Sequence, residues 1–243
     1  MRTDSDPFLH HPELRGKIID SLSSGLRTFT TATLATVAQE LGLPVWWYSD
    51  ADREALRATA LSDRPRGDLW IFAYGSLMWD PAIRFAEVRR ARAPGHARRF
   101  ILKDVFGARG TPDTPGLMAA LDRGTGCDGL LFRIASADID AETEILWRRE
   151  QVGPAYKAPF IEAQLADRSV SALTFVADHD AEMIDAAMTR DEQVRYAATG
   201  HGFLGSSLEY LENIQAKFAA LGIRDPEVDN LLRAAEAYRT ATR

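Results

Sequence analysis

One stretch constrains this chain more than any other: an apolar run that stops abruptly at a glycine and a serine. It reads Asp-Leu-Trp-Ile-Phe-Ala-Tyr-Gly-Ser-Leu-Met-Trp-Asp-Pro and spans residues 68–81. Runs of this length, rich in aromatic and β-branched residues and cut by glycine, are typical of a buried strand. The glycine at the break, Gly75, allows a positive φ or a close approach of another group. Successive backbone N–H groups at such a bend can bind a carboxylate, although a plain strand ending in a turn has the same pattern.

The composition fits a globular protein with one large domain, or one domain with an appendage. Of the 243 residues, 46% are hydrophobic and 26% are charged, which supports a real core. The net charge of −6 argues against a nucleic-acid partner, and no apolar run approaches the ~18 residues that a membrane span needs. Residues 1–10 lack the apolar segment of a signal peptide. The single cysteine, Cys127, excludes an internal disulfide and fits a reducing compartment, so we expect a cytoplasmic protein.

The first 67 residues predict a helical extension that ends in a linker. Apolar residues at helical spacing predict a helix over 28–41 that ends at Gly42. Further helices are expected over 12–22 and 50–61, followed by a linker over 62–67. Part of this region, 34–44, faintly resembles a helix-turn-helix unit but lacks a basic recognition helix. We therefore favour a helical packing arm, and expect the site to form without residues 1–45.

The rest of the chain mixes strand and helix signals, which favours an α/β (α+β) fold. Pro94-Gly95 between two strand-like runs is a hairpin signal, and Ser206 with Glu209 is a capping box. Asp225-Pro226 is typical of the beginning of a last helix. The expected strands are 69–74, 88–93, 98–105, 117–121, 129–134, 158–165 and 169–176; helices are expected over 136–151 and 206–221, and 181–198 is expected to be helical or irregular.

The helix predicted over 136–151 carries the sharpest single candidate for chemistry. At ~100° per residue, with Ile139 set at zero, Leu146 falls at about −20° and Glu150 at about +20°. Glu150 therefore shares the apolar face, where a carboxylate is costly unless it is paired or neutral. Such a carboxylate is a candidate proton carrier. A glutamate that reaches solvent at a frayed helix end, or pairs with an arginine, has the same spacing.

Basic residues gather in one part of the chain. Seven arginines and one lysine fall between Arg84 and Arg109. The cluster either creates a positive field that attracts an anionic substrate or forms the solvated face of two strands, and the sequence does not decide between the two.

Other chemistries find little support in the sequence. Cys127 lies at the beginning of a predicted strand without a recognisable nucleophile signature, so we interpret it as structural. No set of His, Cys, Asp and Glu has metal-ligand spacing, so we expect no metal. Ser76 lies outside a G-x-S-x-G elbow, which argues against a hydrolase triad.

The segment Trp-Ile-Phe-Ala-Tyr-Gly-Ser-Leu-Met-Trp at 70–79 resembles the signature of the ChaC family of γ-glutamylcyclotransferases. Further blocks that resemble the family follow in its order, and the resemblance covers 68–235. Several ordered blocks are hard to produce by chance, whereas Tyr-Gly-Ser-Leu alone would be weak evidence. The blocks are 89–92 with 98–100, 111–117, 121–124, 129–134, 146–150, 155–156, 205–213 and 221–225.

The resemblance implies a γ-glutamylcyclotransferase-like fold, a mixed-sheet barrel with flanking helices. It implies an enzyme that cleaves glutathione to 5-oxoproline and Cys-Gly by attack of the γ-glutamyl α-amine on its own side-chain carbonyl, without a cofactor. Glu150 matches the family's catalytic base. The turn would hold the substrate's carboxylate or stabilise an oxyanion, and Tyr156 would add a hydroxyl. The expected substrate-binding residues are Ala73, Tyr74, Gly75, Ser76, Leu77, Met78 and Tyr156.

Two alternatives remain at this point. One is a non-catalytic protein that binds γ-glutamyl peptides or regulates cation transport, as the family's historical name suggests. The other is a cyclotransferase for different γ-glutamyl amines. In either case the expected division is a helical extension over 1–67, a ChaC-like domain over 68–235 and a tail over 236–243, and the oligomeric state is open.

Overall fold

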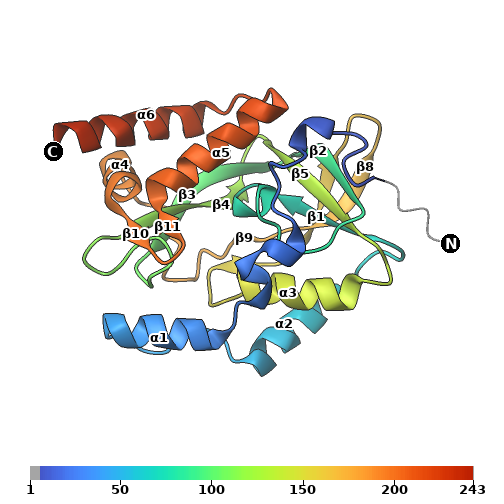
Figure 1. Cartoon of the computed structure of the whole chain (residues 1–243), viewed down its shortest axis with the longest axis horizontal. Helices are drawn as coiled ribbons and strands as arrows, with labels where there is room; N and C mark the ends of the chain where they lie inside the picture. Colours follow the sequence, from blue (N-terminus) through green and yellow to red (C-terminus); the bar gives the residue numbers. More distant parts are fainter. Residues whose placement is uncertain (1–5, 243) are drawn as a thin grey trace. The chain divides into compact units, whose positions relative to one another are not determined.

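The structure, a computed structural model, describes residues 6–242, and the expectations for residues 1–5 and Arg243 lie outside the described part (Figure 1). The chain divides into two compact units that exchange segments along the sequence. Unit 1 runs to Phe29 and continues with Tyr48–Arg98 and Leu121–Val176; unit 2 takes Thr30–Trp47, Arg99–Ala120 and the residues from Ala177 onward. These units cut across the division expected from the sequence, because residues 6–29 and 48–67 belong with the strands of unit 1.

A closed five-stranded barrel forms the centre of unit 1. Its strands follow the order β1-β5-β2-β7-β8 and close where β1 pairs in parallel with β8, at Trp70↔Ala172 and Ile71↔Leu173. The other barrel pairings are antiparallel. The strands are β1 (Leu69–Ala73), β2 (Glu87–Ala93), β5 (Cys127–Ile134), β7 (Phe160–Gln164) and β8 (Ser169–Leu173).

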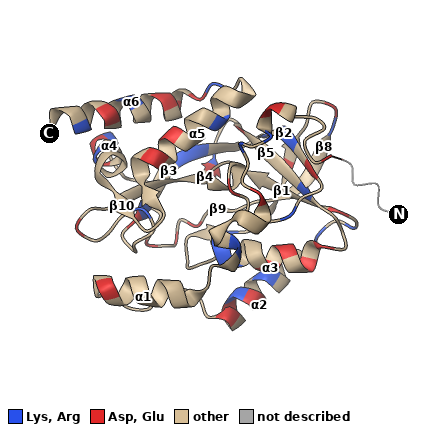
Figure 2. Ribbon diagram, in the orientation of Figure 1, with Lys and Arg blue, Asp and Glu red and all other residues tan. Residues whose placement is uncertain are grey.

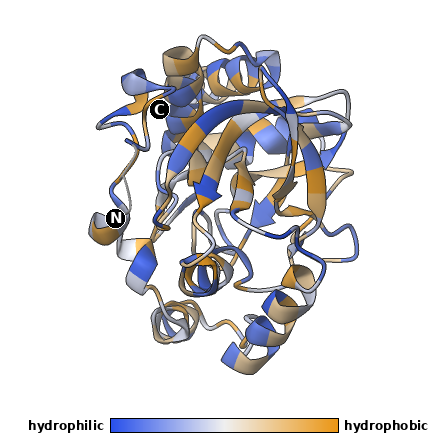
Figure 3. Ribbon diagram, turned by 90° about the vertical axis from the view of Figure 1, so that its right-hand side faces the viewer, coloured by the Kyte–Doolittle hydropathy of each residue, from blue (hydrophilic) through white to orange (hydrophobic). Residues whose placement is uncertain are grey.

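The burial of these strands follows from their sequences. β1 and β5 are apolar along most of their length, and Phe72, Ala73 and Phe132 are fully buried. β2 alternates over its last residues instead, with Ala91 and Ala93 buried and Arg92 between them exposed, as a strand with one face toward the core does. Figure 3 shows strands that carry both hydrophobic (orange) and hydrophilic (blue) positions. The predicted buried strand over 69–74 is thus confirmed, one residue shorter at its end.

Pro94-Gly95 does not join a hairpin, so that prediction is wrong. Both flanking strands exist, but β2 lies beside β5 and β7, whereas β3 (His96–Asp104) lies beside β4 (Gly116–Arg123). The chain turns with Gly95 at φ 74° and enters a second sheet. That sheet has the order β3-β4-β9-β6, with β9 (Val176–Ala177) and β6 (Tyr156–Lys157) as short strands.

Two helices of unit 1 lie alongside each other, α2 (Asp50–Leu61) and α3 (Ile139–Glu150) (Figure 1). Both were predicted, and Ser49 caps α2 by accepting the N–H of Asp52. The helix expected over 12–22 is absent: the chain forms short 3₁₀ turns there, η1 (Pro12–Leu14), η2 (Ser21–Ser23) and η3 (Gly25–Thr28). The predicted helical extension is therefore only partly helical.

Helices dominate unit 2. They are α1 (Thr31–Leu41), α4 (Arg190–Thr199), α5 (Ser207–Leu221) and α6 (Pro226–Ala241), with a small ribbon of β10 (His201–Gly202) and β11 (Gly205–Ser206). The last three helices contact one another. The predicted capping box of Ser206 and Glu209 is confirmed, and the Asp225 carboxylate accepts the backbone N–H groups of Glu227 and Val228.

The end of α5 offers a clean test of these local signals. Gly222 ends the helix in the left-handed conformation at φ 66°, and a Cβ built there would meet no atom within 4 Å. Gly222→Ala is therefore expected to destabilise the protein by ~1 kcal/mol through backbone strain alone. Urea unfolding measures this change.

Gly25→Ala is the matched control for this test. A Cβ there would also meet nothing within 4 Å, but the backbone is not left-handed. We expect that variant to be neutral or slightly stabilising. Equal losses in both variants would contradict the assignment of the strain to φ.

Candidate active site

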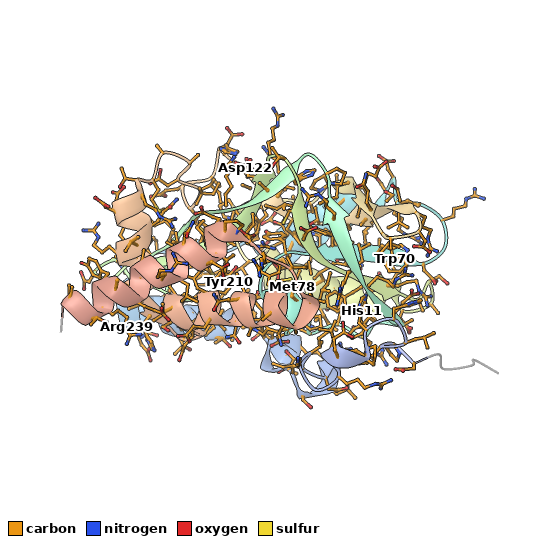
Figure 4. The ribbon with its side chains drawn as sticks, turned by 90° about the horizontal axis from the view of Figure 1, so that it is seen from above. His11, Trp70, Met78, Asp122, Tyr210 and Arg239 are labelled. Carbon is orange, nitrogen blue, oxygen red and sulfur yellow. The ribbon has the colours of Figure 1, made fainter. Side chains whose placement is uncertain are left out.

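The candidate anion-binding turn follows the last residue of β1. Ser76–Met78 form one 3₁₀ turn, η4, in which the N–H of Met78 donates to the carbonyl of Gly75 at 2.9 Å. Gly75 has φ −129°, so of the two possibilities for this glycine, a positive φ and a close approach of another group, the first does not apply. In Figure 4, Trp70 and Met78 lie toward opposite ends of the segment that holds β1 and this turn.

Two side chains, one from β3 and one from the residue after β8, hold the carbonyl groups that lead into the turn. The buried guanidinium of Arg98 donates to the carbonyl of Tyr74 at 2.8 Å, and the hydroxyl of Thr174 donates to the carbonyl of Phe72 at 3.0 Å. Because these carbonyls are fixed, the peptide planes that follow have a defined direction. The turn is therefore held by its own hydrogen bonds and by the end of the barrel.

Within this segment, the hydroxyl of Ser76 is the functional side chain nearest to solvent. Ala73, Tyr74, Gly75, Leu77 and Met78 are all buried, whereas Ser76 is half-buried. Of these residues, Ser76 is therefore the one most accessible to a ligand.

Glu150 is the last residue of α3, on the helix face that Ile139 and Leu146 share. Those two side chains are 5% and 0% exposed, whereas the Glu150 side chain is 15% exposed. The predicted placement on the apolar face is confirmed, and the carboxylate has an open side. Glu150 is not isolated there: its Oε1 accepts a hydrogen bond from Nε of Arg149 at 2.7 Å.

Arg149 connects Glu150 to the turn after β1. Its guanidinium is only 4% exposed. It donates through Nη2 to Oγ of Ser76 at 2.8 Å and through Nη1 to the backbone carbonyl of Asp80. The structure thus brings two of the predicted site residues, Glu150 and Ser76, onto the same guanidinium. Sequence analysis did not single out Arg149, although it directly precedes the candidate base.

Tyr156 reaches the same end of α3 through Gln151. The side-chain amide of Gln151 donates to the carbonyl of Tyr156 at 2.9 Å, and Gln151 is buried. The ring of Tyr156 lies 6.5 Å from that of Phe175, which in turn packs edge-on against Trp147 at 5.4 Å. Tyr156 is therefore held beside the end of α3, and its role in the site stays a proposal.

A buried ionic cluster anchors the other end of α3. Glu142 is fully buried, and its carboxylate accepts hydrogen bonds from Arg27 at 2.8 and 2.9 Å and from Nε and the backbone N–H of Arg84, both at 2.8 Å. Burial alone would raise the pKa of Glu142, but the hydrogen bonds from Arg27 and Arg84 outweigh it and the pKa is lowered. Arg27 also donates to the carbonyl of Ala82 at 2.8 Å. The segment before α1 therefore ties α3 to the chain that follows the turn.

The basic cluster between Arg84 and Arg109 is mostly paired with the protein's own acceptors. Arg84 pairs with Glu142, Arg90 with Glu13 and Arg92 with Asp128. Beside the second pair, Nε2 of His11 (Figure 4) accepts the backbone N–H of Arg90 at 3.0 Å. Figure 2 shows blue and red positions interspersed along the chain. This pattern favours solvated, ion-paired strand faces over a positive field for substrate.

Other predicted features are placed as follows. Cys127 is buried at the start of β5, in keeping with a structural role. Among residues 6–242, no group of three or more His, Cys, Asp and Glu side chains has the arrangement of a metal site. Over the same described residues, we find no helix with the length and apolar character needed to cross a bilayer.

Comparison with known proteins defines the class to which this fold and site belong. The structure resembles the crystal structure of a selenomethionine-labelled γ-glutamyl cyclotransferase specific to glutathione from yeast, with a TM-score of 0.66, 23% sequence identity, and coverage of 72% of this chain and 98% of that one. The fold is thus that of the γ-glutamylcyclotransferases, as the resemblance implied.

Comparison of the sequence then identifies the family. The family model described as ChaC-like protein matches residues 69–238. The glutathione-specific γ-glutamylcyclotransferase of Escherichia coli (strain K12) is 33% identical over 187 residues, which cover 76% of this chain and 80% of that protein. The glutathione-specific γ-glutamylcyclotransferase 1 of Homo sapiens is 29% identical over 157 residues, covering 60% and 70%. The chain belongs to the ChaC-like family.

Proposed function

We propose that this protein is a glutathione-specific γ-glutamylcyclotransferase, which cleaves glutathione to 5-oxoproline and Cys-Gly in the cytoplasm. The relatives from Escherichia coli and Homo sapiens carry this activity in their names, and the first of them covers most of the chain. The observation that carries the proposal is the arrangement around Arg149, which joins a partly open carboxylate, Glu150, to the turn after β1 through Ser76.

The reaction depends more on how the substrate is positioned than on reactive groups of the protein. The substrate's α-amine attacks its own γ-carbonyl carbon, a C–N bond forms in a five-membered ring, and the bond to the Cys-Gly nitrogen breaks. Because the attack is intramolecular, the protein mainly has to hold the folded-back conformer. The attacking amine starts as an ammonium ion and loses a proton, and the leaving amine gains one.

Glu150 is the proposed carrier of that proton. A carboxylate within reach of both nitrogens can accept the proton from the ammonium and return it to the leaving amine. Its side chain is 15% exposed, so one side of it is open to a ligand. In this proposal the backbone of residues 73–78 and the hydroxyl of Ser76 bind the substrate's α-carboxylate or the developing oxyanion, and Tyr156 contributes to the pocket. No cofactor takes part in these steps.

The direct test is an assay of the purified full-length protein with glutathione. We expect 5-oxoproline and Cys-Gly in equal amounts, measured by chromatography, and much slower turnover of γ-glutamyl-alanine and of a γ-glutamylamine at the same concentration. If either comparison compound is turned over faster than glutathione, that compound and not glutathione is the preferred substrate. Binding of glutathione without 5-oxoproline from any of the three compounds would overturn the enzymatic proposal in favour of a γ-glutamyl-binding protein.

A further inference from the structure

We infer that Arg149 is a positioning residue that sets which group of the site accepts a proton and which donates one. The inference rests on the proposed function, because it concerns the same reaction. It goes beyond that function by assigning the base to one oxygen of Glu150 and a donor role to the hydroxyl of Ser76.

The evidence is the number and nature of the acceptors that one buried guanidinium serves. Arg149 donates to Oε1 of Glu150 at 2.7 Å, to Oγ of Ser76 at 2.8 Å and to the carbonyl of Asp80. Its Nη1 also lies 3.7 Å from a carboxylate oxygen of Asp80. An arginine side chain is planar and has donors in a fixed fork, so three acceptors around it are held in fixed relative directions. Lysine, with one nitrogen, cannot reproduce this arrangement.

The consequence for Glu150 is an unequal pair of oxygens. Arginine has donors only, so the oxygen that faces it, Oε1, must act as an acceptor and cannot carry a proton on that side. Because the guanidinium occupies one lone pair of Oε1 and stabilises negative charge there, Oε2 is the more basic oxygen and takes the proton from the substrate's ammonium. Because the rigid guanidinium holds Oε1, it also fixes the direction in which Oε2 points.

The consequence for Ser76 is the opposite role. Its Oγ accepts the hydrogen bond from Nη2 of Arg149, so the single hydroxyl hydrogen points elsewhere. That hydrogen can be donated to a substrate carboxylate or to an oxyanion. Arg149 thus leaves Glu150 as a proton acceptor and Ser76 as a hydrogen-bond donor toward the substrate.

The test compares Arg149→Met, which removes every donor, with Arg149→Lys, which keeps the charge. We expect both to lower kcat for glutathione by ~10², the usual effect of a misplacement of about 1 Å, with a smaller change in KM. Arg148→Lys is the control, since Arg148 donates to the carbonyl of Arg27 at 3.2 Å and touches neither Glu150 nor Ser76 in the described contacts. It should stay within about twofold of wild type, the size expected away from the reacting groups.

A double-mutant cycle separates positioning from a merely structural role. If Arg149 acts by directing Glu150, then Arg149→Met should cost clearly less once Glu150→Gln is present, because only its effect through Ser76 then remains. Additive losses would overturn the inference. A wild-type kcat in Arg149→Lys would also overturn the inference. This second variant keeps the test valid if Arg149→Met fails to fold. Absence of 5-oxoproline from the wild-type protein would instead count against the proposed function itself.

Discussion

Glu150→Gln is expected to lower the turnover of glutathione by ~10² to 10⁴ while leaving its affinity nearly unchanged. The glutamine keeps the shape of the side chain and can still accept the hydrogen bond that Arg149 donates to Oε1. It cannot accept the ammonium proton, so only the steps that move this proton suffer. The measurement is kcat and KM from 5-oxoproline formation, together with calorimetric binding of glutathione.

Glu144→Gln supplies the matched control for this variant. Glu144 lies on the same helix, and its substitution by glutamine removes the same charge, but Glu144 is exposed. It should behave as wild type. If Glu150→Gln loses binding and keeps its rate at saturation, Glu150 is a clamp for the substrate's amine rather than its base. Unchanged activity of that variant would contradict the proposed mechanism.

Arg27→Ala is expected to destabilise the protein by about 3 kcal/mol, because it leaves a buried carboxylate short of its main partner. Glu142 is fully buried and would lose both hydrogen bonds from Arg27, and the carbonyl of Ala82 would lose a third. The estimate lies at the low end for a broken buried pair because Arg84 still donates to Glu142. Urea unfolding of variant and wild type measures the difference.

Arg15→Ala is the control for the Arg27 variant. Arg15 lies in the same segment and pairs with Asp6, but its side chain is 54% exposed. Exposed pairs contribute little, so we expect a change of less than about 1 kcal/mol. Similar losses in the two variants would mean that the segment responds to the loss of any arginine rather than to the unpairing of Glu142.

The same ion cluster predicts how stability depends on acid. The pKa of Glu142 is lowered in the folded protein, so its stabilising contribution is complete above the ordinary pKa of a glutamate, ~4.3, and is lost as the pH falls through the folded value. Arg27→Ala removes a cause of that lowering. The gap in unfolding free energy between wild type and Arg27→Ala should therefore narrow as the pH falls below ~4. If the difference in unfolding free energy stays constant with pH, the contribution of Arg27 to stability does not depend on the charge of Glu142.

These contacts also change the expectation for the N-terminal residues. We expected the site to form without residues 1–45, since the family blocks begin near residue 68. Arg27 lies in that segment, and the backbone N–H of Ile19 donates to the carbonyl of Trp79, directly after the turn, at 2.8 Å. Removal of the segment would take Arg27 away from Glu142 and release the turn, so we now expect it to reduce both stability and activity.

The sequence predicted those parts of the fold that local signals determine. The strand at residue 69, the capping box at Ser206 and the glycine stop at Gly222 all depend on neighbours in the chain, and the structure has each of them. The hairpin at Pro94-Gly95 was wrong because a turn signal shows that the chain bends but not which strands pair afterwards. That choice depends on β5 and β4, which come later in the chain.

The candidate site shows the same limit. Periodicity placed Glu150 on the inner face of α3, and the structure agrees. It placed Arg149 at about −80° and Trp147 at about +80°, so nothing distinguished the arginine that contacts Ser76. Glu142, at about −60°, was not singled out as a buried carboxylate, although it is more deeply buried than Glu150. Its burial depends on Arg27, 115 residues earlier, and periodicity carries no information about such a partner.

The parallel pairing of β1 with β8 has a consequence for how the protein is made on the ribosome. The strand that leads into the turn finds its neighbour, and the carbonyl of Phe72 finds Thr174, only when a segment 102 residues further along has been synthesised. Long-range pairings of this kind form slowly and leave strand edges exposed until they form. A nascent chain that has released Tyr156 but not Leu173 therefore carries every residue of the proposed chemistry, yet its barrel is open. Such a chain has no site, and during translation it offers the edge of β1 to other chains.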